Sequence, residues 1–329
     1  MVRAILSEYD PRSRLIRFDR PLDGLVNRVF LLITTCGDLV LRVVDDRSSD
    51  WKLRKDIAIF DHMRRLGLPV PRVLRVDTSR QVIPLGYSLS ERLPGEPYSQ
   101  VFACLTGTDN ARISGQLGDL LGRLHSTTFQ RFGDVFATED GLDIGPVHEL
   151  RPRPDGQSPG PFSAWSELHA AFVEARLRFM VGTGFDDLVE PAQAWFDANW
   201  TLLDVHVTPR LLHMDLHRGN ILIREGEISG ILDIEESIVG HNEYDLMRTE
   251  LAHLRGQDPA FADAFFTAYG RHVRLDEGYE DRRQFYDASR TLVWITSLIR
   301  YGNGYVRGSQ DQSCLAARKH LRTLLGDFG

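Results

Sequence analysis

The sequence is poor in cysteine, in lysine and in long apolar runs. Its three cysteines are odd in number and far apart, so they predict neither a disulfide framework nor a paired Cys-x-x-Cys metal site. No run approaches the roughly 18–20 apolar residues of a membrane span, and the segment from Met1 to Asp10 is too short and too charged for a secretory signal. We therefore expect a cytoplasmic protein that is neither secreted nor anchored, with no membrane partner.

Basic charge is also scarce. The chain has 39 Lys and Arg against 46 Asp and Glu, which gives a formal net charge of -7. Non-specific nucleic-acid binding needs a basic surface that displaces counterions from phosphates, so we expect no nucleic-acid partner. The hydrophobic share of 42% is ordinary for a folded chain, and 329 residues exceed one average core. We expect two lobes in a monomer or homodimer.

The first third of the chain predicts strands with one helix. Two β-branched runs in residues 29–44, separated by Gly37-Asp38, predict a β-hairpin, and helical spacing of apolar residues predicts a helix over 51–66. A further apolar stretch over 82–93 ends at two prolines and a glycine. We place a lobe boundary near Leu93, which gives a nucleotide-binding lobe over 1–93, with a hinge at 88–93, and a helical lobe over 94–329.

The rest of the chain predicts mainly helices. Its apolar residues recur at helical spacing in five stretches, at 109–126, 162–205, 244–255, 260–270 and 280–300. Residues 131–162 are rich in Gly, Pro and Asp without a sustained period, so this segment is expected to form a long functional loop.

Candidate catalytic groups concentrate between Leu211 and Leu246. Asp215 and Asn220 stand on either side of a glycine turn that leads into an apolar run, and a second short apolar run ends in Asp233. Phosphoryl transfer requires a carboxylate that orients the attacking hydroxyl and an oxygen pair that holds Mg²⁺ against the phosphates. These three residues can supply that set, with Asp215 as base and the other two as metal ligands.

This region resembles the aminoglycoside phosphotransferase and choline-kinase branch of the protein-kinase-like fold. The family's catalytic loop reads His-Gly-Asp-Leu-His-x-x-Asn, and the run from His213 to Asn220 departs from it only at Met214. A second family signature, Gly-Asp-Pro-x-x-Asp-Leu, is similar to the run from Gly240 to Leu246, where His-Asn replaces Asp-Pro. The resemblance implies an α+β, bilobal fold, with a small β-rich lobe and a larger helical lobe. It also implies transfer from ATP or GTP to the hydroxyl of a small-molecule acceptor.

Weaker correspondences follow the family's order along the chain. The resemblance implies a shortened nucleotide loop over 24–27, which includes Asn27, and a strand over 40–43 that presents Arg42 to the phosphates. Asp56 then takes the position of the usual helix glutamate, and the longer, planar arginine can reach the shorter carboxylate. The hinge backbone at Ser90, Glu91 and Arg92 is expected to bind the purine.

Two alternatives remain open from the residues. His213, Asp215 and His217 alternate, so on a strand they would share one face and could bind the metal of a hydrolase. The chain could also be an inactive, kinase-like regulatory module. In the kinase interpretation both histidines hold the catalytic loop, and Asp245 ties that loop or a helix start.

The acceptor is expected between the catalytic loop and the helices of the larger lobe. Glu235, Glu236 and Arg218 are candidate contacts, together with the 131–162 segment. Carboxylates there would suit a cationic compound, and the Phe162–Trp165 segment resembles phosphotransferases of the hygromycin type. An antibiotic of aminoglycoside, nucleoside or peptide type is therefore the first expectation, which makes the chain a resistance kinase. A metabolic sugar or amino alcohol is the alternative.

Overall fold

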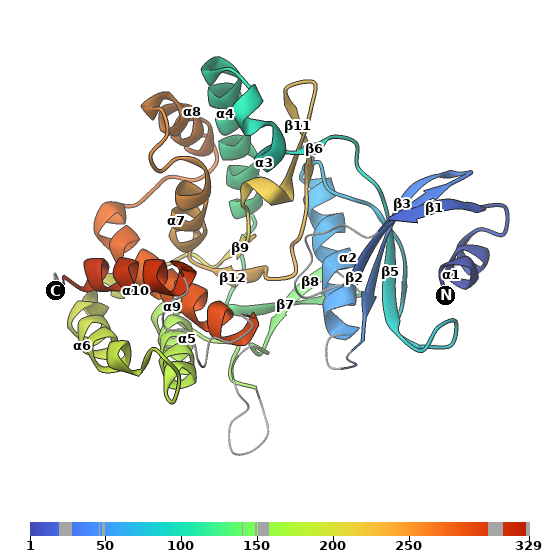
Figure 1. Cartoon of the computed structure of the whole chain (residues 1–329). Coiled ribbons are helices and arrows are strands. Elements are labelled where there is room, and N and C mark those ends of the chain that lie inside the picture. Colours follow the sequence, from blue (N-terminus) through green and yellow to red (C-terminus); the bar gives the residue numbers. More distant parts are fainter. Residues whose placement is uncertain are drawn as a thin grey trace.

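The computed structural model describes residues 1–19, 28–45, 47, 50–139, 141–148, 150, 158–301 and 312–326. A twisted sheet lies at the N-terminal end of the molecule, and a larger, mostly helical part follows it (Figure 1). This is the α+β, two-lobed arrangement expected from the sequence.

The N-terminal sheet is antiparallel and has five strands in the order β1-β2-β3-β5-β4. Its strands are β1 (Leu15–Asp19), β2 (Arg28–Thr34), β3 (Gly37–Val44), β4 (Val73–Asp77) and β5 (Gly86–Glu91). The predicted hairpin is confirmed, because β2 pairs with β3 from Arg28 opposite Val43 to Thr34 opposite Gly37. The turn itself was misplaced, since Thr35 and Cys36 form it and Gly37 already belongs to β3.

Helix α1 (Val2–Tyr9) was not anticipated. It buries Ile5 and Leu6 against one face of the sheet, where they join a cluster with Leu32, Leu41 and Leu89. The helix therefore covers an apolar face that the sheet would otherwise present to water.

Helix α2 (Asp50–Arg65) confirms the helix predicted after the hairpin. Its apolar face buries Leu53, Ile59 and Met63, which recur at the spacing of one helical face. The helix ends where Gly67 adopts a φ of +74° and the Leu68 N–H donates to the Met63 carbonyl at 3.0 Å. Glycine takes this left-handed conformation without the steric cost that other residues bear.

A second hairpin packs against α2. Its strands are β7 (Gly133–Thr138) and β8 (Gly141–Gly145), so the loop predicted over 131–162 is wrong in this part. Trp51 of α2 stacks on Phe136 and His148, with ring centroids 5.4 and 4.1 Å apart. Figure 1 shows this hairpin beside α2, between the N-terminal sheet and the helices. Strand pairing with distant residues stabilises it, and local composition carries little sign of that.

Helices dominate the remainder of the chain. They are α3 (Tyr98–Val101), α4 (Gly107–His125), α5 (Trp165–Met180), α6 (Val189–Asn199), α7 (Asn242–His253), α8 (Pro259–Tyr269), α9 (Tyr279–Tyr301) and α10 (Gln312–Leu325). The helices predicted around 109–126, 244–255, 260–270 and 280–300 are confirmed, whereas α10 was missed. Among the described residues no helix is long and apolar enough to cross a membrane.

Short strands connect these helices to the candidate catalytic loop. One small sheet has the order β8-β7-β12-β9 and another the order β11-β10-β6. Their remaining strands are β6 (Glu96–Pro97), β9 (Arg210–Leu212), β10 (Ile221–Arg224), β11 (Glu227–Ile231) and β12 (Ile238–Gly240). The catalytic-loop residues lie between β9 and β10, and Asp233 lies two residues after the end of β11. Both parts of the signature are thus anchored on paired strands.

Candidate active site

The loop between β9 and β10 presents the carboxylate of Asp215 to solvent. About a third of this side chain is exposed, at 36%. The Asn220 side-chain amide donates to the Asp215 carbonyl at 2.9 Å and to its carboxylate Oδ2 at 3.2 Å. His217 accepts from the Gly219 N–H at 2.9 Å, which closes the turn between the two residues. The loop therefore holds an accessible carboxylate in a fixed orientation.

The buried carboxylate of Asp245 holds the first residues of this loop. Its carboxylate accepts the His213 N–H at 2.6 Å and the Met214 N–H at 3.0 Å, and it lies 3.1 Å from Nε2 of the buried His125. Burial alone would raise the pKa of Asp245, but the hydrogen bond and charge of His125 outweigh it and lower the pKa. Asp245 thus ties the loop, as expected from the sequence.

Met214 explains why the family usually has glycine at its position. Its φ is +72°, in the left-handed region that side chains disfavour. The side chain is buried in the core that contains Trp165 and Tyr244. Packing therefore offsets a backbone cost that a glycine would not have.

Asp233 lies beside Asn220 because the intervening backbone groups are paired. The Leu232 N–H donates to the Asn220 carbonyl at 2.9 Å, and the Leu232 carbonyl lies 3.1 Å from Nε2 of His213. Desolvation, followed by the negative charge of Glu235, raises the pKa of Asp233 to about 7, while Arg42 opposes the shift. The residue as a whole is exposed to solvent. A cation bound beside Asp233 would counteract the effect of the neighbouring negative charges on its pKa.

The donor atoms at this place fit a divalent magnesium ion. The Asn220 amide nitrogen is used by Asp215, which leaves its side-chain oxygen for another partner, and Asp233 adds a carboxylate. Mg²⁺ prefers oxygen ligands, and such an ion would offset the negative charge that Glu235 adds beside Asp233.

Arg42 is held by two carboxylates. Its guanidinium bonds to Asp56 of α2 at 2.5 Å and also to Glu235, and about 15% of its side chain is exposed. Burial alone would lower the pKa of Arg42, but Asp56 and Glu235 outweigh it and raise the pKa. The structure therefore pairs Arg42 with Asp56 and places Glu235 on the same guanidinium.

Lys55 also reaches this cluster, a contact that no sequence pattern had indicated. Its buried ammonium donates to the Glu235 backbone carbonyl at 2.9 Å and lies 5.2 Å from the Trp51 ring centroid. Burial lowers the pKa of Lys55 despite the nearby carboxylates. Lys55, which directly precedes Asp56 in α2, thus holds the backbone of Glu235 in place.

The expected hinge lies at the end of β5, a central strand. Ser90 pairs with Val40 of β3, and the N–H groups of Glu91 and Arg92 donate to the carbonyls of Arg72 and Asp38. These two donors are therefore used inside the protein. The N–H of Leu93, one residue further, donates to no group of the described part of the chain. The remaining residue expected to bind nucleotide, Asn27, lies outside the described residues.

The other expected acceptor contacts lie in different places. Arg218 donates to the His253 carbonyl at 3.1 Å, and its guanidinium lies 3.6 Å from the Phe102 ring centroid. Glu236 is half exposed and lies 3.5 Å from the ammonium of Lys52.

Two arginines beside Asp215 were missed by the sequence analysis. Nη2 of Arg248, on α7, lies 3.8 Å from Oδ1 of Asp215. Arg290, on α9, is close enough to Arg248 and Asp215 for both charges to affect its pKa. No signal in a single sequence marks either residue, because both are ordinary members of helical stretches.

The metal-hydrolase alternative finds no support in the geometry. His213 bonds to a backbone carbonyl and His217 closes the turn at Gly219, so each has a role in holding the loop. Within the described residues, the ligand-type group that gathers closely is a different one, His241 with Glu243 and Asp276. Arg282 already donates hydrogen bonds to both carboxylate oxygens of Glu243, at 2.6 and 2.7 Å.

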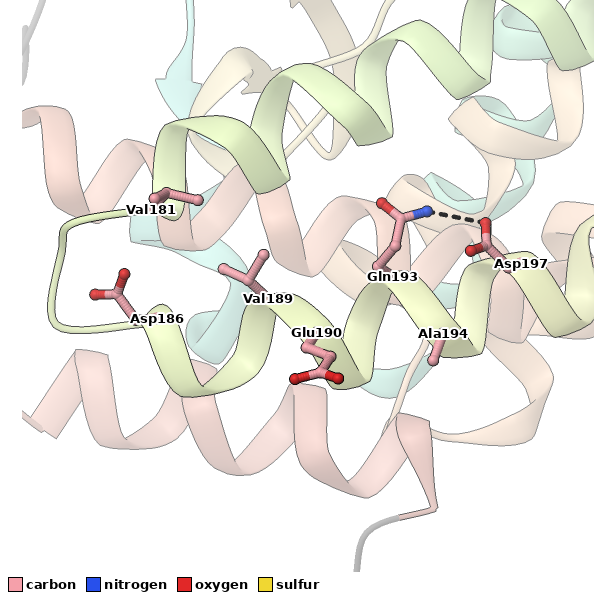
Figure 2. Close-up of a pocket in the computed structure, with 7 residues that line it drawn as sticks. All are labelled: Val181, Asp186, Val189, Glu190, Gln193, Ala194 and Asp197. Carbon is pink, nitrogen blue, oxygen red and sulfur yellow. Dashed lines mark hydrogen bonds between the residues drawn. The ribbon is translucent and has the colours of Figure 1, made fainter.

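A pocket of about 520 Å³ lies away from these residues, where the chain passes from α5 to α6 (Figure 2). It is lined by Val181, Asp186, Val189, Glu190, Gln193, Ala194 and Asp197. Figure 2 shows that two of its polar side chains bond to each other, Gln193 to Asp197 at 2.9 Å. None of its lining residues belongs to the signature region.

Comparison with known proteins decides the family. The model of the phosphotransferase enzyme family matches residues 19–285. The chain belongs to this family. It is therefore a nucleotide-dependent phosphotransferase acting on a hydroxyl group, as the sequence predicted.

Relatives of this phosphotransferase include two homoserine kinases. That of Gluconobacter oxydans is 25% identical over 295 residues, which cover 89% of this chain and 81% of the relative. That of Pseudomonas aeruginosa is 29% identical over 283 residues, which cover 82% and 75%. Among solved structures, the aminoglycoside phosphotransferase APH(4)-Ia has a TM-score of 0.69 at 17% identity, over 100% of this chain and 98% of that one. At that identity the likeness shows the fold alone.

Proposed function

We propose that this phosphotransferase moves the γ-phosphoryl group of ATP or GTP to the hydroxyl of a small metabolic amino alcohol, with homoserine as the first acceptor to test. The observation that carries the proposal is the accessible Asp215 carboxylate, which Asn220 holds beside Asp233. We also propose a connection between two lobes near Leu93. The exposed thiols of Cys36 and Cys104 support the expected cytoplasmic location.

The donor side of the proposal rests on Arg42 and the carboxylates around it. Arg42 would bind donor phosphates, because a guanidinium offers several N–H groups in a fork that matches phosphate oxygens. Asn220 and Asp233 would hold Mg²⁺, which neutralises charge on the transferring phosphoryl group. The N–H of Leu93, which has no acceptor among the described residues, is the backbone donor that we assign to the purine, in place of Glu91 and Arg92, whose N–H groups donate to Arg72 and Asp38.

The acceptor side rests on Asp215. Its carboxylate would accept the hydroxyl proton while the hydroxyl oxygen forms a bond to the γ-phosphorus. The bond from that phosphorus to the β-phosphate oxygen breaks, and the nucleoside diphosphate leaves with the electron pair. Asn220 keeps the carboxylate oriented through its side-chain amide, so no covalent enzyme intermediate is required.

The choice of acceptor follows the relatives rather than the fold. Homoserine kinases match over most of this chain, whereas the aminoglycoside enzyme shares only the fold at 17% identity. Glu235 and Glu236 were the carboxylates that would have favoured a cationic antibiotic. They form ion pairs with Arg42 and Lys52 instead. A metabolic acceptor is therefore preferred over an antibiotic.

The test is an acceptor panel that contains homoserine, simple amino alcohols, sugars and aminoglycosides. Each is incubated with ATP and with GTP, and mass spectrometry detects the phosphate adduct. We expect an adduct on homoserine, and we expect Asp215→Asn to lower kcat by about 10²- to 10⁴-fold. Asp204→Asn is the matched control, since Asp204 is exposed and lies outside the signature.

Two results would contradict the proposal. An adduct on aminoglycosides alone would restore the antibiotic interpretation. Nucleotide binding without any adduct would support the regulatory-module alternative.

A further inference from the structure

We propose that Arg248 and Arg290 form an anion site beside Asp215, and that the acceptor is a small hydroxy acid whose carboxylate these two arginines bind. This inference rests on the proposed function, because it names the acceptor's chemical class at the same site. It adds two binding residues that lie outside both signature motifs.

Arg248 lies between the catalytic loop and a pocket. Its Nη2 atom is 3.8 Å from the Asp215 carboxylate, beyond hydrogen-bonding distance, and about 17% of its side chain is exposed. On α7 it lies one turn before Leu251 and Ala252, which line a pocket of about 440 Å³. Residues three and four apart lie on the same helix face, so Arg248 shares a face of α7 with Leu251 and Ala252 and lies at the end of that face near Asp215.

Arg290 forms part of the wall of the same pocket. The pocket is lined by Leu251, Ala252, Arg255, Arg290, Trp294, Ala316 and His320, from helices α7, α9 and α10. Burial, followed by the charge of Arg248, lowers the pKa of Arg290, while Asp287 and Asp215 oppose the shift. Arg290 therefore lines a pocket together with Leu251 and Ala252, one turn along α7 from the arginine that lies 3.8 Å from the catalytic carboxylate.

The other basic side chains of this pocket, Arg255 and His320, share Asp287 as a partner. Asp287 accepts from Arg255 at 3.2 Å through one oxygen and lies 3.0 Å from Nε2 of His320 through the other. Arg290 makes no hydrogen bond or ion pair with any residue in the described ranges. Among the described residues, the positive charge of Arg290 thus has no hydrogen-bonded or ion-paired partner.

A carboxylate on the acceptor would supply the missing partner. It could accept from both guanidiniums, remove their mutual repulsion and replace the water that a half-buried arginine loses. The short separation between Arg248 and Asp215 suits a compact molecule, in which few carbon atoms separate hydroxyl from carboxylate. Leu251 and Trp294 offer apolar surface to those carbons, whereas a polycation would meet like charge here.

The experiment compares acceptors that differ in one group. γ-Hydroxybutyrate has a hydroxyl and a carboxylate, propanolamine has a hydroxyl and an amine, and butanediol has neither ionic group. We expect kcat/KM to be highest for γ-hydroxybutyrate. Arg290→Gln should raise its KM by about 10- to 100-fold, because a charge-assisted pair contributes about 1.5–3 kcal/mol. The KM for nucleotide should stay unchanged, and so should kcat/KM for butanediol.

Matched variants separate binding from folding. Arg290→Lys keeps the charge but loses the planar fork, so it should recover part of the loss. Arg300→Gln changes an exposed arginine further along α9 and should behave like the wild type. Circular dichroism establishes that each variant is folded, and Arg290→Lys provides the measurement if Arg290→Gln does not fold.

Calorimetric titration with γ-hydroxybutyrate distinguishes the two proposals, because it requires no phosphoryl transfer. Arg290-dependent binding without any phosphorylated product would overturn the kinase proposal and leave the anion site standing. Turnover of propanolamine and butanediol that exceeds that of γ-hydroxybutyrate, with no effect of Arg290→Gln or Arg290→Lys, would overturn the anion site alone.

Discussion

Arg42 and Glu235 form an ion pair although 193 positions separate them in the chain. Arg42 belongs to a strand of the N-terminal sheet, and Glu235 follows the second aspartate of the signature. Asp56 completes the cluster from α2. One guanidinium therefore joins three segments that all lie close to the proposed nucleotide phosphates.

Arg42→Lys should weaken nucleotide binding, since an ammonium on a shorter stem cannot serve Asp56 and Glu235 together. The KM for ATP is expected to rise about tenfold, and the free energy of unfolding to fall by about 1–3 kcal/mol because a buried carboxylate loses its partner. Steady-state kinetics and urea unfolding measure the two effects. The double variant Arg42→Lys with Asp56→Glu should recover part of both, because the longer acid reaches the shorter base. No recovery would mean that Asp56 does not position Arg42.

Met214→Gly should give a more stable protein than Met214→Ala. Both variants lose the same buried side chain and so should lie about 2–5 kcal/mol below the wild type. Glycine tolerates the φ of +72°, however, and should retain about 1 kcal/mol more than alanine. Chemical unfolding of the two variants side by side tests this order. Equal stabilities would show that the loop relaxes to a different backbone conformation.

Asp245→Asn should loosen the catalytic loop without removing any group that contacts substrate. An amide has one acceptor oxygen where the carboxylate serves two backbone N–H groups, so we expect a loss of about 1–3 kcal/mol in unfolding free energy. The kcat should fall more than the affinity for nucleotide. Asp119→Asn is the control, because Asp119 pairs with half-exposed side chains and its change should cost less than about 1 kcal/mol. A variant that keeps full kcat would remove Asp245 from the positioning role.

Stability should decrease as the pH falls below about 6.5. Burial lowers the pKa of His241 to about 3 and that of His253 to about 4, so the folded protein keeps both neutral while the unfolded chain takes up protons. Their contribution is complete above about 6.5 and is lost progressively toward the folded pKa values, at about 1.4 kcal/mol per pH unit for each histidine. Urea unfolding across this range measures the slope.

His253→Gln should reduce the slope of unfolding free energy against pH by the contribution of one histidine. The exposed His206 provides the control as His206→Gln, for which the slope should match the wild type. An unchanged slope in His253→Gln would assign the acid sensitivity to other groups.

The sequence predicted those parts of the fold that local pattern controls. Helix α2 and the β2–β3 hairpin have clear apolar periodicity, and the motif around Asp215 has a fixed order of residue types. By contrast, β7 pairs with the distant β12, β8 pairs with β7, and both pack against α2, so their short sequences were taken for a loop. Long-range pairing of this kind leaves little signal within a single window.

The same contrast between local pattern and long-range contact applies to the candidate site. Asp215, Asn220 and Asp233 could be proposed because one motif places them within a few residues of two strands. The contacts of Glu235, Lys55, Arg248 and Arg290 arise where separate segments meet, and a single sequence does not show which faces come together. Glu235 was expected to face the acceptor for that reason, whereas it bonds to Arg42.

The stack of Trp51 on Phe136 and His148 bears on how such an enzyme is regulated. In protein kinases, the helix that carries the acidic partner of the phosphate-binding cation is repositioned during activation. Here that helix is α2, and moving Asp56 away from Arg42 would separate these stacked rings. The stacked rings thus oppose a displacement of α2 and help to keep Asp56 beside Arg42.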